Sequence, residues 1–437
     1  MSKESLGVNN NVTDAMFQTV FGNLMDSTFG YRGYKTRPDF AIHRIILTPK
    51  VGATTPSYSS ALDYEIPKRA AVLCRVSSRW NVAALAGVAP SFVDYYGFAA
   101  HKTAIMRYGS NDLQTIRPLE MYLTNRLDHR RKDQEAIAEL AAGDLSLTER
   151  QARATGTQQI TVHWPFHFSE LPDKAFFTEA VGSPLEFQFR LDEFENLVND
   201  SAAGVTGGAI SNYRLECEMV HVEDYERDYH IHRTLDDDGL IIACREHNYQ
   251  PNLIVPVNTT QIRYPLRNLK KACVEIRWVL RDRQQLTQNF DNSLDYFNFL
   301  SFALTADNDG SEEWELDASG VEIISPMNEQ WNIFVENRDR HSGDSGDRIY
   351  GASFSFYPED KRNGTGHKTW AGMTNPELLI NFGGSTAATP PSAQGVAAVP
   401  PIPGGATGAD GDYIITAISR DLQAEHRIQG DVVTIFK

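Results

Sequence analysis

Several segments of the chain alternate between hydrophobic and polar residues. In LEFQFRL (185–191) every second residue is a large hydrophobic one, and Glu, Gln and Arg lie between. RLECEMVHV (214–222) and ACVEIRWVLRD (272–282) follow the same rule. Successive side chains of a strand point to opposite faces, so this period of two indicates antiparallel strands with one buried and one solvated face. The pattern predicts an all-β protein.

Other segments with hydrophobic and polar residues in alternation predict further strands between turn residues. They are FAIHRIILTP (40–49), LDYEIPKRAAVLCRVSS (62–78), ITVHWPFHF (160–168), WNIFVENR (331–338), RIYGASFSFYPE (348–359), PELLINF (376–382) and the segment 412–437. One segment differs: residues 131–155 are rich in Ala, Glu, Leu and Gln, which favour helix. We expect Gly143 and Asp144 to divide it, with a capping box at 146–149 opening the second part.

The organisation predicted from these elements is two β-sandwich halves. Residues 1–20 form an arm, 21–222 the first half, the charged segment 223–239 a connector and 240–437 the second half. Residues 383–411 are a low-complexity Gly, Pro, Ala and Ser loop, which cannot bury enough hydrophobic surface to order itself. Two halves of roughly 200 residues suit two sandwiches side by side better than one barrel.

The segment 348–372 joins a strand to a Gly-containing loop. We expect Tyr350, Ala352, Phe354 and Phe356 on its buried side, and Pro358 to end the strand by withholding a backbone donor. A phosphate-binding loop would need a helix starting at the following Lys, which Trp-Ala-Gly does not favour. We therefore interpret the segment as a corner of the second sandwich.

Composition and charge narrow the function further. The chain has 437 residues, 41% of them hydrophobic, and a net charge of −16. A field of this sign repels nucleic acid, so direct genome binding is disfavoured. Four widely spaced cysteines do not form a disulfide scaffold and indicate a reducing compartment. We expect neither a signal peptide nor a transmembrane segment.

Candidate chemistry is sparse. His163 with His167, and His230 with His232, have spacings that a metal site could use, but no third ligand lies nearby in sequence. The acidic turns 235–239 and 307–310 lack the full calcium-loop pattern. Carboxylate pairs occur in expected turns at Glu359/Asp360, Glu312/Glu313 and Asp192/Glu193. We expect solvated roles for these pairs, and no catalytic, cofactor-binding or metal-binding residues.

The order of these pieces resembles the major capsid proteins of large eukaryotic double-stranded DNA viruses. The likeness is carried by DSTFGYRGYKTRPDFAI (26–42), LDYEIPKRAAVLCRV (62–76), HWPFHFSELPDKAFFTEAVGSPLEFQFRL (163–191), QIRYPLRNLKKACVEIRWVLRD (261–282), SFSFYPEDKRNGTGHKTWAG (353–372) and YIITAISRDLQAEHRIQGDVVTIF (413–436). The resemblance implies a double jelly-roll: two consecutive antiparallel jelly-roll sandwiches with short helical insertions in loops.

The same resemblance implies a structural role without enzyme activity or cofactor. Three chains would form a pseudo-hexagonal homotrimer that tiles the icosahedral shell of the virion after assembly in the host cytoplasm. Expected partners are neighbouring trimers, minor capsid proteins, penton proteins and an inner viral membrane. The alternatives are a minor or penton capsid protein of the same kind of virus, or a β-sandwich carbohydrate-binding or hydrolase protein.

Overall fold

The computed structural model describes most of the chain. The described residues are 41–68, 71–170, 176–179, 182–199, 204–221, 228, 240–256, 259–269, 271–282, 297, 299–300, 302, 312–343, 347–359, 365–382, 413–429 and 432–436. The expected arm, the low-complexity loop and the connector, apart from Asp228, lie outside them.

The first half is built from two antiparallel sheets. The sheet named here the β3 sheet has the order β1 (Ala41–Leu47), β13 (Ile210–His221), β3 (Ala71–Val82) and β8 (Gln158–His163), with β9 (Phe176–Phe177) also beside β3. The β6 sheet has the order β2 (Ala61–Glu65), β10 (Leu185–Leu191), β6 (His101–Tyr108) and β7 (Asn111–Ile116). Two short pairs join β11 (Val198–Asn199) to β5 (Ser91–Phe92) and β12 (Thr206–Gly207) to β4 (Leu85–Ala86).

The second half has a corresponding pair of sheets. The β17 sheet has the order β14 (Leu240–Tyr249), β23 (Tyr413–Gln429), β17 (Ala272–Asp282) and β20 (Tyr350–Ser353), with β15 (Leu253–Val255) and β24 (Val432–Phe436) beside β23 and β21 (Lys368–Thr369) beside β17. The β18 sheet has the order β16 (Gln261–Pro265), β22 (Glu377–Asn381), β18 (Glu313–Ala318) and β19 (Val321–Met327).

The chain follows the same path through both halves. Strands β1, β2, β3, β6, β7, β8, β10 and β13 correspond in order to β14, β16, β17, β18, β19, β20, β22 and β23. In each half the first, third, sixth and eighth of these strands form one sheet, and the others form the second sheet. Eight strands exchanged between two sheets in this way form a jelly roll, so the chain is a double jelly-roll.

Helices lie in the connections between strands. They are α3 (Tyr96–Ala99), α4 (Pro118–Asp128), α5 (Arg131–Ala141), α6 (Leu147–Ala154), α7 (His167–Glu170) and η3 (Phe194–Asn196) in the first half, and α9 (Glu329–Trp331), the π-helical turn η5 (Asn332–Glu336) and α10 (Asn337–Arg340) in the second. Among the described residues, no helix is long and apolar enough to cross a membrane.

The predicted helical insertion is confirmed in detail. Helices α5 and α6 occupy 131–154, and Ala142 and Asp144 between them have positive φ. Ser146 Oγ accepts from the N–H of Glu149, whose carboxylate accepts from the N–H of Ser146. This is the expected capping box, which satisfies two donors at the helix start.

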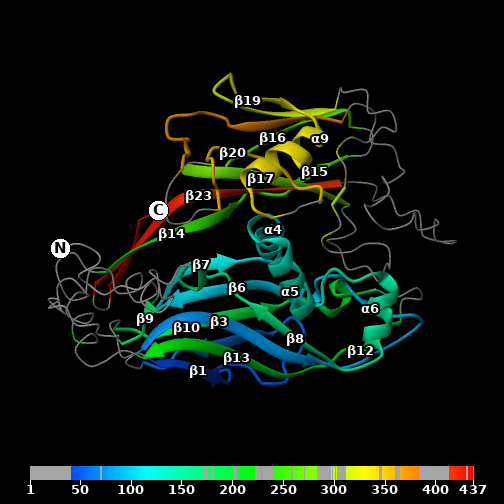
Figure 1. The fold of residues 1–437 in the computed structure, drawn as a ribbon, viewed down its shortest axis with the longest axis vertical. Helices are drawn as coiled ribbons and strands as arrows, with labels where there is room; N and C mark the ends of the chain where they lie inside the picture. The colour runs from blue at the N-terminus through cyan, green and yellow to red at the C-terminus, as the bar shows by residue number, and fades with distance from the viewer. Residues whose placement is uncertain are drawn as a thin grey trace, which may run out of the picture.

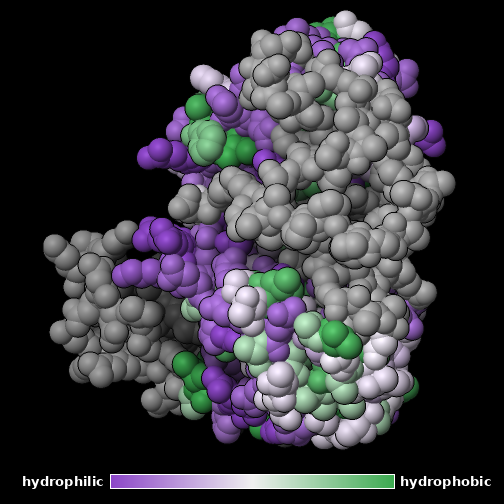
Figure 2. All heavy atoms as spheres, turned by 90° about the vertical axis from the view of Figure 1, so that its right-hand side faces the viewer, coloured by the Kyte–Doolittle hydropathy of each residue, from purple (hydrophilic) through white to green (hydrophobic). Residues whose placement is uncertain are grey.

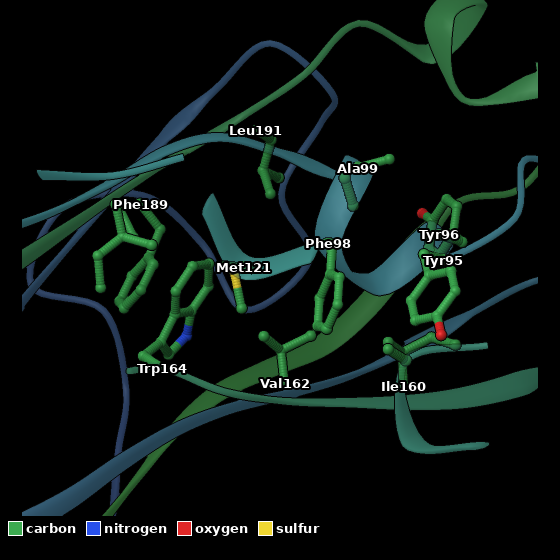
Figure 3. Close-up of a cluster of buried hydrophobic side chains, with 14 of the residues drawn as sticks. Tyr95, Tyr96, Phe98, Ala99, Met121, Ile160, Val162, Trp164, Phe189 and Leu191 are labelled. Atoms are coloured by element: carbon green, nitrogen blue, oxygen red, sulfur yellow. The ribbon is translucent and has the colours of Figure 1, made fainter. Parts of the chain in front are cut away.

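Each sandwich encloses a hydrophobic core, and the first cluster continues into the second half through Val279 and Ile418. The alternating residues of 185–191, 214–222 and 272–282 supply buried side chains as predicted, including Phe187, Leu215 and Trp278. Figure 3 shows the first core, where Phe189 of β10 lies near Trp164 and α3 inserts Phe98 between the layers. The strand periodicity therefore determined which side chains face inward.

One expected strand is wrong, and another is shorter than expected. WNIFVENR is helical and lies within α9, η5 and α10, because Asn328 Oδ1 caps the segment by accepting from the N–H of Trp331. The strand beginning at Tyr350 ends at Ser353, and Phe356 is 67% exposed instead of buried. The chain bends after Phe354, which still packs its ring on Trp370 at 5.8 Å.

His101 is a buried histidine in the first core. Its Nδ1 lies 3.1 Å from the carbonyl oxygen of Gly97 and its Nε2 lies 2.7 Å from Tyr213 Oη. The carbonyl can only accept, so Nδ1 carries the proton and Nε2 accepts from the tyrosine. Burial lowers the pKa of His101 to about 4, although the bond to Gly97 opposes the shift. The residue is neutral in the folded protein at neutral pH.

We predict that His101 makes the fold less stable in acid. Between about pH 6.5 and 4 the unfolded chain binds a proton that the folded chain does not, so stability falls as the pH drops, by up to roughly 3 kcal/mol. Burial raises the pKa of Asp421 to about 6, which acts in the opposite direction. The test therefore compares unfolding free energies at pH 7 and 4.5 in the wild type and His101→Gln, because Asp421 cancels in the difference. Equal pH dependence in both proteins would contradict the prediction.

Candidate functional site

The two jelly rolls meet through helix α4, which lies between them in Figure 1. All of its residues except Arg126 and Asp128 are buried, since the first half covers one side and the second half the other. Met121 points into the first core (Figure 3). On the opposite side, the ring of Tyr122 stacks on Phe297 with centroids 4.5 Å apart. A helix buried on both sides fixes how the two sandwiches are placed.

The N-terminal end of α4 contacts strand β14. Pro118 occupies the first turn, where its missing N–H costs no helical bond. The N–H of Glu120 donates to Tyr249 Oη at 3.1 Å, and the Glu120 carboxylate lies 2.7 Å from His247 Nδ1. The guanidinium of Arg117 lies 4.3 Å from the centroid of the Tyr249 ring, a cation–π contact. These contacts place the helix start over one strand of the second half.

The C-terminal end of α4 enters a buried network of charges. Asp128 receives two bonds from Arg420 of β23, with Nη2 at 2.8 Å from Oδ2 and Nη1 at 3.4 Å from Oδ1. Arg420 Nε lies 3.2 Å from Glu275 of β17, and Arg277 Nε lies 3.1 Å from the same carboxylate. His341 lies between the two carboxylates, with Nδ1 at 3.4 Å from Asp128 and Nε2 at 3.1 Å from Glu275.

Opposite charges compensate each other in this network. Burial alone would raise the pKa of Glu275, but Arg420, Arg277 and His341 together hold it well below its usual range. Glu275 is therefore ionised at any physiological pH. A buried ion pair of this kind adds little net stability when intact but is costly to break, since one charge is then left without a partner.

A third set of contacts closes the side of α4. Tyr122 Oη donates to Asp347 Oδ2 at 2.9 Å, and Arg126 Nε lies 3.0 Å from the same oxygen. The N–H of Gly343 donates to the carbonyl of Leu127 at 2.8 Å. A Cβ at Gly343 would lie 2.5 Å from that carbonyl oxygen, so only glycine permits this approach. Chain segments of both halves thus pack directly against the helix.

The structure separates the predicted histidine pair. His163 is exposed on β8, with Nδ1 2.6 Å from Ser77 Oγ. His167 is buried, and its N–H donates to Gln114 Oε1 at 3.0 Å. The two rings thus have different surroundings and different partners. The remaining candidates lie outside the described residues: His230, His232, Asp360 and the segments 235–239 and 307–310.

The carboxylate pairs have local roles where the structure describes them. Asp192 Oδ1 accepts from the N–H of Glu193 at 2.8 Å and from Asn196 Nδ2 at 3.1 Å, which stabilises the turn η3. Glu312 is 1% exposed and precedes β18, in which Glu313 lies. The geometry of the Asp192 pair is that of a capped turn rather than of two carboxylates facing a substrate.

One group of side chains near α4 has metal-ligand geometry. One ligand atom from each of Asp128, His341 and Glu359 lies within 4.8 Å of the others. These atoms already have partners: Asp128 pairs with Arg420, and Glu359 Oε2 accepts from the N–H of Ser342 at 2.9 Å. A divalent cation here would also face the guanidinium of Arg420. The chemistry therefore favours a structural ion-pair network over a metal site.

Sequence reasoning missed this network. Glu275, Arg277 and Arg281 alternate with hydrophobic residues in β17, which is the pattern of a solvent-facing side, yet all three are at most 4% exposed. The available signal was the mixture of both charge signs on one strand face, with His341 and Arg420 far away in sequence. The packing of α4 and of the segment 329–340 against this face makes it an interior.

Comparison with solved structures identifies the fold. VP54 of PBCV-1 aligns over 94% of this chain and 100% of its own, with a TM-score of 0.68 and 13% sequence identity. The Faustovirus major capsid protein aligns over 98% of this chain and 100% of its own, with a TM-score of 0.67 and 9% identity. A chain of the Sputnik virophage structure aligns over 92% and 89%, with a TM-score of 0.55 and 9% identity.

The fold is thus that of double jelly-roll capsid proteins, and both jelly rolls are included in the match. By sequence, no family model and no curated protein matches the chain. The arrangement of strands is therefore shared with these proteins although few residues are.

We predict that Asp128→Asn lowers the free energy of unfolding by about 3 kcal/mol, because the buried guanidinium of Arg420 loses a charged partner. The matched control is Glu135→Gln, which breaks the exposed pair of Arg131 and Glu135 one helical turn apart. That change should cost only about 0.3–0.5 kcal/mol. Denaturant unfolding of both variants measures the difference, and similar losses for the two would show that the network does not stabilise the fold.

Proposed function

We propose that this chain is the major capsid protein of an icosahedral double-stranded DNA virus, and that three copies form a pseudo-hexagonal capsomer. The observation that carries the proposal is the presence of two complete jelly rolls in one chain, joined rigidly by the buried helix α4. Three such chains supply six similar sandwiches, which suit a hexagonal lattice while the symmetry of each building block stays closed.

The comparisons support this proposal through the proteins they match. A chain of the PBCV-1 virus capsid aligns over 94% of this chain. The Faustovirus protein, which is matched over its full length, is a major capsid protein. A minor or penton protein would be expected to hold one jelly roll, so the repeated fold disfavours that alternative.

The proposal includes a division of the chain and a set of partners. Residues 21–222 and 240–437 would form the two jelly rolls, with 1–20 as an arm, 223–239 as a connector and 383–411 as a projecting loop. The protein would act structurally in the shell of the virion, assemble in the host cytoplasm, and contact minor capsid proteins, penton proteins and the inner membrane. Its net charge of −16 disfavours contact with the genome.

We predict that the purified full chain sediments as a trimer and shows a hexagonal outline in negative-stain electron micrographs. The physical reason is that a shell subunit with two similar sandwiches must complete a ring to present equivalent edges. A chain that remains monomeric at all accessible concentrations, or particles with a different outline, would contradict the proposed capsomer.

A further inference from the structure

The two jelly rolls repeat more than their strands. In each, a helical segment begins two residues after the fifth strand: α4 follows β7, and the segment 329–340, formed by α9, η5 and α10, follows β19. Each also has an Arg-Trp pair on its third strand, Arg79-Trp80 in β3 and Arg277-Trp278 in β17, and both tryptophans are fully buried. The β3 and β17 sheets are therefore equivalent surfaces, and the two helical segments are equivalent elements.

Among the residues that the structure describes, one of the two equivalent contacts is made inside the chain. Helix α4 of the first half covers the outward face of the β17 sheet at β14 and β23, where the side chain of Arg420 is 3% exposed. Arg277 on the same face is 3% exposed because the segment 329–340 of its own half covers it, with its Nη1 donating to Asn337 Oδ1 at 2.7 Å. Figure 1 shows the β17 sheet facing α4, while the β3 sheet lies on the far side of the molecule. Among the described residues, α5 reaches the side of the β3 sheet at β8, where its Leu140 lines a hollow.

The outward face of the β3 sheet is open. Ile42 and Ile46 of β1 are 60% and 51% exposed, and Arg44 and Arg75 are exposed beside them. A hollow of about 190 Å³ lies on this face, and the side chains around it include Arg44, Arg75, Arg79, Thr161, His163 and Leu140. The lining of the hollow is mostly charged and polar and includes Glu216 and Glu218, while the exposed isoleucines lie on the same strand as Arg44. Exposed hydrophobic residues that gather on one face mark a surface that binds a partner.

The helical segment 329–340 is the matching uncovered element. Two asparagines attach the inner side of this segment to β20 and to the residue just before that strand. They are Asn332 and Asn337, and Nδ2 of Asn337 donates to the carbonyl of Ile349 at 2.8 Å. Its outer side carries Trp331 and Phe334, which are 55% and 64% exposed. Apart from its ends, the equivalent helix α4 is buried throughout. Hydrophobic patches are visible on both halves in Figure 2.

We propose that the segment 329–340 of one copy packs on the outward face of the β3 sheet of a second copy, as α4 packs on the β17 sheet within one chain. Trp331 and Phe334 would lie against the exposed isoleucines of β1 and the guanidinium groups of Arg44 and Arg75. Aromatic rings bind such groups through cation–π contact. The inference rests on the proposed capsomer and specifies the surfaces that join its subunits.

The contact is head-to-tail, because each copy offers one helix and one sheet face. Heterologous contacts close into a ring when the rotation between copies divides a full turn. In a ring of three copies, three α4 contacts within chains would then alternate with three contacts between chains. Each sandwich of the capsomer would meet its two neighbours through the same pair of elements.

Cross-linking tests the assignment without removing the contact itself. In a chain carrying Gln330→Cys and Thr161→Cys, the first thiol lies on the exposed helix beside Trp331 and the second lines the hollow. A short bis-maleimide should join copies into covalent dimers and trimers on a denaturing gel. The matched control pairs Gln330→Cys with Ser110→Cys, which is exposed at the turn between β6 and β7 in the other sheet, and it should give only the wild-type background.

Disrupting one surface should dissociate the capsomer. The double variant Trp331→Asp and Phe334→Asp should sediment as a folded monomer with a wild-type circular dichroism spectrum, since both side chains are exposed. The control Val88→Asp replaces a 61% exposed residue elsewhere and should remain trimeric. If the wild type forms trimers but the double variant does so equally and no cross-links form, the assigned surfaces are wrong although the capsomer stands. If the wild type is monomeric, the capsomer itself is refuted.

Discussion

The burial of α4 between the two sandwiches is the constraint on which the rest of the structure depends. A β-sandwich buries the inner faces of its sheets and leaves the outer faces to water or to another layer. Here α4 covers the outer face of the β17 sheet, and residues on that face form a charge network instead of a hydrated surface. The two jelly rolls thereby share a buried interface.

The network restricts geometry more than it adds stability. Compensated buried charges are nearly neutral in free energy against hydrophobic packing, but they tolerate few alternative positions, because each displaced ion loses its partner. Asp128, Glu275 and Arg420 come from three distant segments, and the close approach at Gly343 adds a steric limit.

Much of the fold could be predicted from the sequence, because the inner face of each strand is set locally. The period-two pattern predicted the buried residues of β10, β13 and β17, and the capping box at Ser146 located α6. The failures occurred where local patterns compete. WNIFVENR alternates like a strand, but Asn328 caps it as a helix, and the bend after Phe354 turns Phe356 out to solvent.

The candidate site could not be predicted, because the same polar alternation encodes three different environments. The outer residues of a strand can face water, another part of the chain, or another copy, and the sequence of the strand does not distinguish them. Arg277 is covered by the segment 329–340, in which Asn337 Oδ1 accepts from its Nη1 at 2.7 Å, whereas Arg79 at the equivalent position has a side chain that is 30% exposed. The difference in exposure between these two arginines depends on where a helix from elsewhere in the chain lies. The uncovered aromatic side of the segment 329–340 and the open face of the β3 sheet follow from the same comparison. A fold that repeats itself within one chain therefore allows equivalent surfaces to be compared directly, which the strand patterns of the sequence do not.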